Sequence, residues 1–141
     1  MHTDIVGTLG GRQVFGARRH QIDLLEEVER GLPTKAYNVI SKVLGLTPDE
    51  EDRLLQVSLR TRARWKHRPR LDPVTSDRIV RLARVLALAT DVLVRRDHAV
   101  EWLREPADAL GGRTPLEVMT TDLGAEKVTN MLYQMEHGIY A

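Results

Sequence analysis

The chain marks the starts of helices with one repeated device, a capping residue followed directly by proline. Three such starts occur, at Thr47-Pro48, Asp72-Pro73 and Thr114-Pro115. Proline is favoured in the first turn of a helix because its missing N–H would have no partner there. In the two threonine cases a glutamate follows three residues after the cap, which completes a capping box. These helix-start signals predict helices along most of the chain.

Apolar residues recur at helical spacing. After Pro73 one stripe contains Ile79, Leu82, Leu86, Ala89 and Leu93, and the last segment repeats the pattern with Ala125, Val128, Leu132 and Met135. The alternation typical of strands is rare, and the Asn-Gly and Asp-Gly turns of hairpins do not occur in the sequence. The sequence therefore predicts an all-α protein, with helices at about residues 20–30, 34–44, 48–55, 59–67, 74–94, 97–104, 114–120 and 123–137.

The length of 141 residues suits one domain or two very small ones. The first 16 residues contain four glycines and one aromatic residue, so residues 1–20 are expected to form a mobile arm. The stripe after Pro73 is long for a monomer of this size, and half of it is expected to be exposed. We therefore predict that residues 72–95 form a connecting helix that also makes a homodimer.

The sequence lacks the residues that several kinds of catalytic and metal-binding site require. The sequence has no cysteine, which excludes disulfides, thiolate catalysis and cysteine-bound zinc. Its five histidines form no metal-binding pattern, and no nucleophile or phosphate-loop motif occurs. We expect no catalytic residues, no metal and no cofactor. The longest uncharged run has eight residues, and the start lacks the features of a signal peptide, so a cytoplasmic protein without a membrane segment is expected.

Charge is strongly polarised along the chain. Residues 57–71 carry six Lys/Arg and no acidic residue, whereas residues 105–141 carry two Lys/Arg and six acidic residues. Opposed segments of this kind favour two partners, one anionic and one presenting positive charge, although two solvated faces would give the same count.

Residues 49–67 have the layout of a helix-turn-helix, with a short helix, a break at Gln56-Val57, and a second helix rich in cations. In this motif the second helix enters the major groove of DNA. We predict base contacts from Arg60, Thr61 and Arg64, and phosphate contacts from Lys66, Arg68 and Arg70. Ser58 is the expected N-cap and is included in the predicted DNA-binding set. Trp65 is expected to be a core aromatic.

Two positions depart from the usual motif. Gln56 stands where the turn commonly has glycine, and Arg62 stands where an apolar residue is usual. We expect Arg62 to lay its methylene groups on the core and to direct its guanidinium outwards.

The segment from Ala99 onward resembles the C-terminal toxin-binding domain of the Xre/MbcA/ParS antitoxin family. The matching elements are Ala99, Trp102-Leu103, Pro106, Ala109-Leu110-Gly111-Gly112, Thr114-Pro115-Leu116-Glu117, Thr121, Gly124-Ala125, Val128, Leu132 and the closing Glu136-His137-Gly138-Ile139-Tyr140-Ala141. Residues 33–67 resemble the Xre-type helix-turn-helix of the same family, and residues 72–89 its connecting helix.

The resemblance implies a helix-turn-helix unit over residues 21–71 and a toxin-binding domain over residues 96–141. It also implies an antitoxin that is not itself an enzyme. Members of this family form dimers, bind a RES-domain toxin that degrades NAD⁺, block its active site, and repress their own operon by binding DNA.

The end of the chain suggests how such a block would work. Gly138 would free the closing residues from the last helix, and a carboxylate with an aromatic neighbour can occupy a dinucleotide site. The predicted toxin-binding residues are Tyr133, Glu136, His137, Gly138, Ile139, Tyr140 and Ala141. The alternative is a stand-alone transcriptional regulator whose acidic C-terminal domain serves dimerisation.

Overall fold

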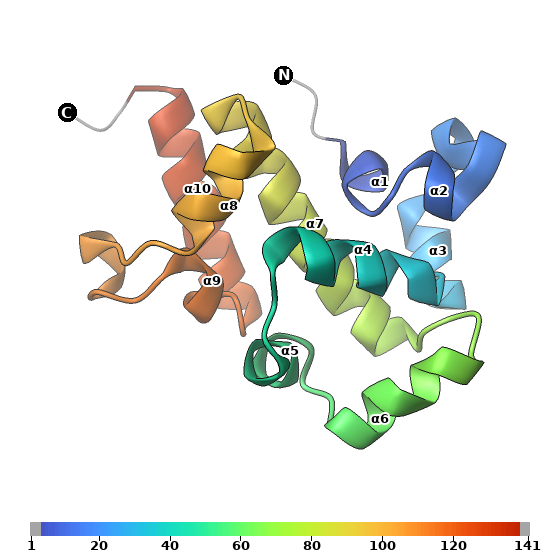
Figure 1. The fold of residues 1–141 in the computed structure, drawn as a ribbon. Helices are drawn as coiled ribbons and strands as arrows, with labels where there is room; N and C mark the ends of the chain where they lie inside the picture. The colour runs from blue at the N-terminus through green and yellow to red at the C-terminus, as the bar shows by residue number, and fades with distance from the viewer. Residues whose placement is uncertain (1–3, 139–141) are drawn as a thin grey trace. The chain divides into compact units, whose positions relative to one another are not determined.

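The computed structural model describes residues 4–138, which divide into two compact units, residues 4–83 and residues 84–138 (Figure 1). Residues 4–138 contain no strand, and one isolated bridge pairs Pro33 with Arg70. The predicted all-α class is confirmed. No helix within the described part of the chain has the length and apolar character that crossing a membrane requires.

The N-terminal unit holds the helix-turn-helix. Its elements are α1 (Ile5–Thr8), α2 (Arg12–Phe15), the 3₁₀ helix η1 (Gly16–Gln21), α3 (Leu24–Arg30), α4 (Thr34–Leu44), α5 (Pro48–Leu55), α6 (Leu59–Arg64), η2 (Trp65–His67) and the first part of α7 (Pro73–Leu93). Its buried apolar residues include Leu9, Leu32, Ile40, Leu44, Leu55, Trp65, Ile79 and Leu82.

Three short helices, α1, α2 and η1, occupy most of residues 5–21, which corrects the mobile arm predicted for residues 1–20. Leu9 is fully buried, and Asp4 caps α1 by accepting a hydrogen bond of 2.8 Å from the Gly7 amide. The glycines that suggested mobility instead make turns: Gly10 has a φ of +116°, and a Cβ there would lie 3.2 Å from Val39 of α4. The segment is therefore packed structure, and residues 1–3 lie outside the described range.

The N-terminal caps predicted from the sequence are present in the structure. Thr47 and Thr114 each complete a capping box, with Glu50 and Glu117 respectively, and Asp72 accepts a hydrogen bond of 3.1 Å from the Thr75 amide. The ends differ by a few residues from prediction. The helix expected over 20–30 starts anew at Leu24 behind the Asp23 cap, and the helix expected over 59–67 tightens into a 3₁₀ turn at Trp65.

The first part of α7 fixes the remainder of the N-terminal unit. The buried Ser76 hydroxyl accepts a hydrogen bond of 2.8 Å from the Leu32 amide, between α3 and α4. Arg78 donates to the Leu55 carbonyl (2.9 Å) and to Oε1 of Gln56 (3.1 Å), at the turn of the helix-turn-helix. These bonds hold the turn between α5 and α6 against a long helix, so α6 is presented on a rigid support.

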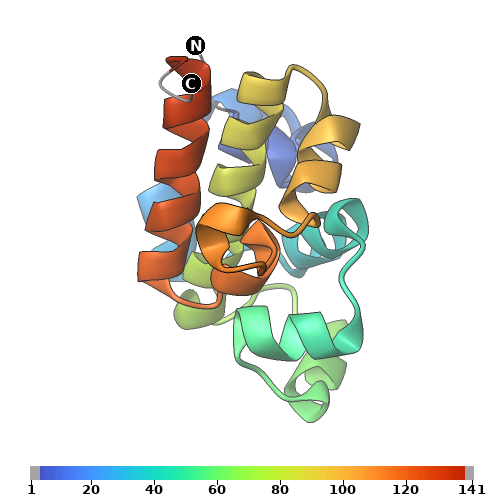
Figure 2. The same cartoon turned by 90° about the vertical axis from the view of Figure 1, so that its left-hand side faces the viewer.

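The C-terminal unit contains the rest of α7, α8 (Arg96–Leu103), η3 (Asp108–Leu110), α9 (Pro115–Val118) and α10 (Asp122–Glu136). Within it α9 contacts both α8 and α10, and Figure 2 shows α10 alongside this part of α7. Its core includes Leu86, Leu103, Leu116, Met119, Val128 and Leu132. Gly124 permits the tightest approach, since a Cβ there would lie 1.6 Å from the Val118 carbonyl oxygen.

The apolar stripe of α7 is buried within the chain itself. Ile79, Leu86 and Ala89 are fully buried and Leu82 is 2% exposed. Leu93, the last residue of the stripe, is partly exposed. The expectation that half of this stripe is exposed is therefore wrong, because its other four residues are buried within the single chain. A homodimer remains a prediction, but the exposed apolar stripe from which it was argued is not present.

Candidate functional site

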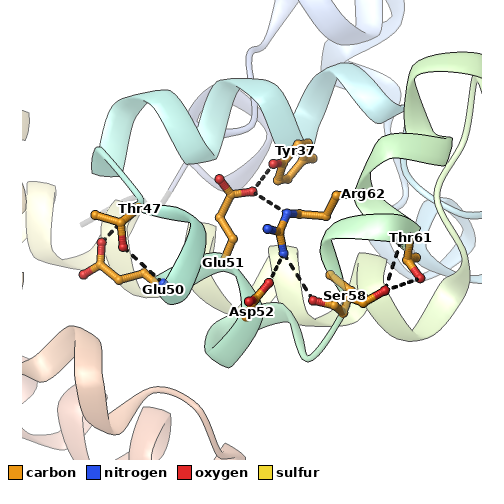
Figure 3. A network of polar contacts seen from close by, with 9 residues as sticks. Tyr37, Thr47, Glu50, Glu51, Asp52, Ser58, Thr61 and Arg62 are labelled. Carbon is orange, nitrogen blue, oxygen red and sulfur yellow. Dashed lines mark hydrogen bonds and ion pairs between the residues drawn. The ribbon is translucent and has the colours of Figure 1, made fainter.

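The helix-turn-helix consists of α5, a three-residue turn and α6. Ser58 is the N-cap of α6, and its Oγ accepts a hydrogen bond of 3.1 Å from the Thr61 amide (Figure 3). A serine oxygen at this position satisfies one of the amides that open every helix. The first turn of α6 is thereby stabilised without any contribution from a partner.

Gln56 adopts the left-handed conformation that glycine usually supplies in this turn. Its φ is +54° and its ψ is +45°. A residue with a Cβ pays a conformational cost there, of roughly 1–2 kcal/mol. The hydrogen bond from Arg78 to its side chain holds Gln56 in place, so the turn keeps its geometry although glycine is missing.

Arg62 is buried together with its charge, which corrects the expectation that its guanidinium points outwards. Its side chain is 7% exposed, its Nε lies 3.5 Å from Oε2 of Glu51, and its Nη1 pairs with Asp52 and donates to the Val57 carbonyl (3.2 Å) (Figure 3). The physical reason is that both carboxylates come from α5, the other helix of the motif, and provide the negative charge that a buried guanidinium needs.

Two aromatic residues close this network. The Tyr37 hydroxyl donates to Glu51, and the Tyr37 ring meets the Trp65 ring edge to face, with centroids 4.8 Å apart. Burial, reinforced by the hydrogen bond to Glu51 and its charge, raises the pKa of Tyr37 to about 12. Trp65 is 5% exposed, which confirms it as a core aromatic.

Most of the predicted DNA-binding side chains are available to a partner. Ser58, Arg60, Arg64, Lys66 and Arg68 are exposed and Thr61 is partly exposed. None of these four cations forms an ion pair with an acidic residue between residues 4 and 138. α6 therefore presents uncompensated positive charge.

Arg70 is engaged inside the unit. Its Nη1 donates to the Gly31 carbonyl (2.8 Å) and to Oε2 of Glu27 (3.2 Å). Gly31 has a φ of +88°, and a Cβ there would lie 1.8 Å from the Leu71 carbonyl oxygen, so the two segments touch through their backbones. Arg70 has a structural partner already, and the sequence offered no signal of this contact between distant residues.

A recess of about 370 Å³ opens beside α6. It is lined by Thr34, Tyr37, Asn38, Pro48, Glu51, Leu59, Arg62, Ala63, Trp65 and Lys66. Leu59 stands on its rim with 68% of its surface exposed. Nothing in the sequence marks Leu59 as exposed, because an apolar residue in a helix is ordinarily assigned to the core.

The second predicted interface is at the end of α10. Tyr133 is 46% exposed, and Oε1 of Glu136 lies 3.9 Å from Nε2 of His137. The other oxygen of Glu136 is shielded from solvent and has no hydrogen-bond partner among residues 4–138. Gly138 follows the helix with a φ of +65°, as expected of a residue that ends it. Ile139, Tyr140 and Ala141 lie outside the described residues.

Comparison with known proteins assigns both units. Residues 23–84 match the Antitoxin Xre-like helix-turn-helix domain, and residues 88–138 match the Antitoxin Xre/MbcA/ParS C-terminal toxin-binding domain. The chain belongs to the Xre antitoxin family. The two matched segments agree closely with the two compact units, and residues 4–22 of this Xre-type chain precede both.

Three curated relatives named "Antitoxin Xre" are similar to the chain. The protein of Pseudomonas putida KT2440 is 35% identical over 94 residues, which are 66% of this chain and 58% of the relative. That of Yersinia enterocolitica is 33% identical over 79 residues (55% and 53%), and that of Photorhabdus laumondii is 38% identical over 65 residues (45% and 44%). The chain thus spans about half the length of the curated relatives it matches.

Proposed function

We propose that this Xre-type chain is an antitoxin whose C-terminal unit binds and inhibits a cognate toxin, and whose helix-turn-helix binds operator DNA. The observation that carries the proposal is the match of residues 88–138 to a toxin-binding domain, over a unit with its own apolar core. The toxin is proposed to be a RES-domain enzyme that degrades NAD⁺, on the resemblance noted in the sequence.

The proposed mode of inhibition is a block of the toxin's active site by the end of the chain. Tyr133, Glu136 and His137 would contact the toxin, and Gly138 would turn the chain so that Ile139, Tyr140 and Ala141 enter the cleft. The acidic balance of residues 105–141 supports this, because a site for the pyrophosphate of a dinucleotide supplies cationic donors.

The test is growth and cellular NAD⁺ in cells that express the adjacent gene alone, with the full chain, or with a chain that ends at Gly138. The full chain is expected to restore both. The truncated chain is expected to co-purify with the toxin but to leave NAD⁺ depleted. Full inhibition by the truncated chain would contradict the block while leaving toxin binding in place.

The proposed DNA binding depends on the exposed cations of α6 and η2. These side chains are exposed, and the segment that contains them, residues 57–71, has no acidic residue. A mobility-shift assay with the DNA upstream of the gene tests it directly. We also propose a homodimer, as the resemblance implies; light scattering that gives 16.0 kDa would exclude it.

A stand-alone transcriptional regulator is the second candidate, favoured by the intact helix-turn-helix geometry alone. Co-purification separates the two functions. An antitoxin retains a stoichiometric toxin when the adjacent gene is co-expressed, whereas a solitary regulator does not.

A further inference from the structure

Leu59 is an apolar side chain placed where DNA-reading residues are expected. It is the first residue of α6, between the Ser58 cap and Arg60, and 68% of its surface is exposed. Ala63 follows four residues later, on the same side of the helix, and is also exposed. Both line the recess beside α6, so they form one apolar strip among cations.

Folding does not account for this leucine. The core of the unit is filled by fully buried residues such as Leu55, and a side chain with two thirds of its surface in water contributes little to it. At the first position of a helix, leucine also provides neither a cap nor a charge that suits the helix dipole.

The position has a clear use if α6 enters a major groove. The N-terminal residues of a recognition helix contact base edges, and the thymine C5-methyl is the apolar group displayed there. Arginine and lysine side chains bind guanine or phosphate and leave a methyl group unread. An exposed leucine with an alanine one turn further on offers a surface that a methyl group can bury against.

We propose that Leu59, together with Ala63, reads a thymine methyl group in the operator and so sets part of the sequence specificity. The inference rests on the proposed DNA binding. It is supported by the charge around the strip: Arg60, Arg64, Lys66 and Arg68 are exposed, and residues 57–71 contain no acidic residue, which suits an anionic duplex better than an apolar protein surface.

The experiment uses the full chain and a DNA site that the wild-type protein selects from a random library. Each thymine of that site is replaced in turn by deoxyuridine, which lacks only the methyl group, and the dissociation constant is measured for each duplex. We expect one or two replacements to weaken wild-type binding about fourfold, the value of one buried methyl group. The Leu59→Ala variant should bind the unmodified site more weakly and be insensitive to those same replacements.

Leu25→Ala is the matched control, because Leu25 of α3 is 69% exposed but does not lie on α6. It should retain both the wild-type affinity and the wild-type response to deoxyuridine. The salt dependence of binding should be the same for Leu59→Ala and wild type, since no phosphate contact is lost.

Two results would overturn the inference in distinguishable ways. If the protein selects a site but no thymine replacement weakens binding, or if Leu59→Ala responds to the replacements as wild type does, the reading of a methyl group is refuted and DNA binding stands. If no DNA is selected at all, the proposed DNA binding fails as well.

Discussion

Arg62 and Glu51 form a buried ion pair across the helix-turn-helix, with 3.5 Å between Nε and Oε2 and side chains that are 7% and 12% exposed. Removing two charges from water costs several kcal/mol per ion, and the pairing compensates only when further hydrogen bonds satisfy both groups. Here Tyr37, Asp52 and the Val57 carbonyl supply them. The arrangement makes the geometry of α5 and α6 dependent on both partners.

Replacing Arg62 alone is expected to be costly. Arg62→Met leaves Glu51 charged and buried with Tyr37 as its remaining partner, which should lower the free energy of unfolding by about 3–5 kcal/mol. Urea denaturation measures this loss. The double variant Glu51→Gln with Arg62→Met removes both charges, so it should be more stable than Arg62→Met alone. Equal stability of the single variant and wild type would show that the pair contributes nothing.

Tyr37 should make stability fall at high pH. Because the pKa of Tyr37 is raised from 10.0 to about 12, the folded state keeps a proton that the unfolded chain loses above pH 10. The unfolded state then binds fewer protons, so the free energy of unfolding decreases between pH 10 and pH 12, whereas below pH 10 the contribution is complete.

The control for this pH effect is Tyr37→Phe, measured beside wild type by urea denaturation at several pH values from 8 to 11. The difference in stability between the two proteins should be constant up to about pH 10 and should shrink above it. A difference that stays constant to pH 11 would contradict the raised pKa.

The turn at Gln56 offers a prediction about backbone strain. Glycine adopts the left-handed conformation without the penalty of a Cβ, so Gln56→Gly should be more stable than Gln56→Ala by about 1 kcal/mol. The two variants lose the same hydrogen bond from Arg78, which makes them a matched pair. Thermal unfolding distinguishes them, and a more stable alanine variant would show that the turn relaxes when the side chain is removed.

Local signals predicted the helices well because their determinants are close in sequence. The threonine capping boxes at Thr47 and Thr114 are complete within four residues, and each stands at the start of a helix as expected. Gly31 and Gly45 end α3 and α4 for a similar reason. The Ser58 cap located α6 and, with it, most of the exposed cations.

Contacts between distant residues were beyond such signals. The charge of Arg62 is buried because Glu51 and Asp52 pair with it, which the spacing of the residues alone did not show. The glycine-rich start is packed because Leu9 is buried and Gly10 lies close to Val39 of α4, and no local pattern shows such proximity between distant residues. For the same reason the length of the α7 stripe does not indicate a dimer surface, since Ile79, Leu82, Leu86 and Ala89 are buried within the chain itself.

Arg68 and Arg70 should differ in their effect on DNA binding, although both are predicted phosphate contacts in the basic segment. Arg68 is exposed and has no acidic partner among the described residues, whereas Arg70 is held by Glu27 and the Gly31 carbonyl. Because Arg68 is expected to contact a phosphate, Arg68→Ala should reduce the magnitude of the slope of log affinity against log salt by roughly 0.9. Arg70→Ala should leave that slope unchanged and instead lower thermal stability, because Glu27 loses a partner. Fluorescence anisotropy over a range of salt concentrations measures both slopes, and a reduced slope for Arg70→Ala would show that Arg70 exchanges its internal contacts for DNA.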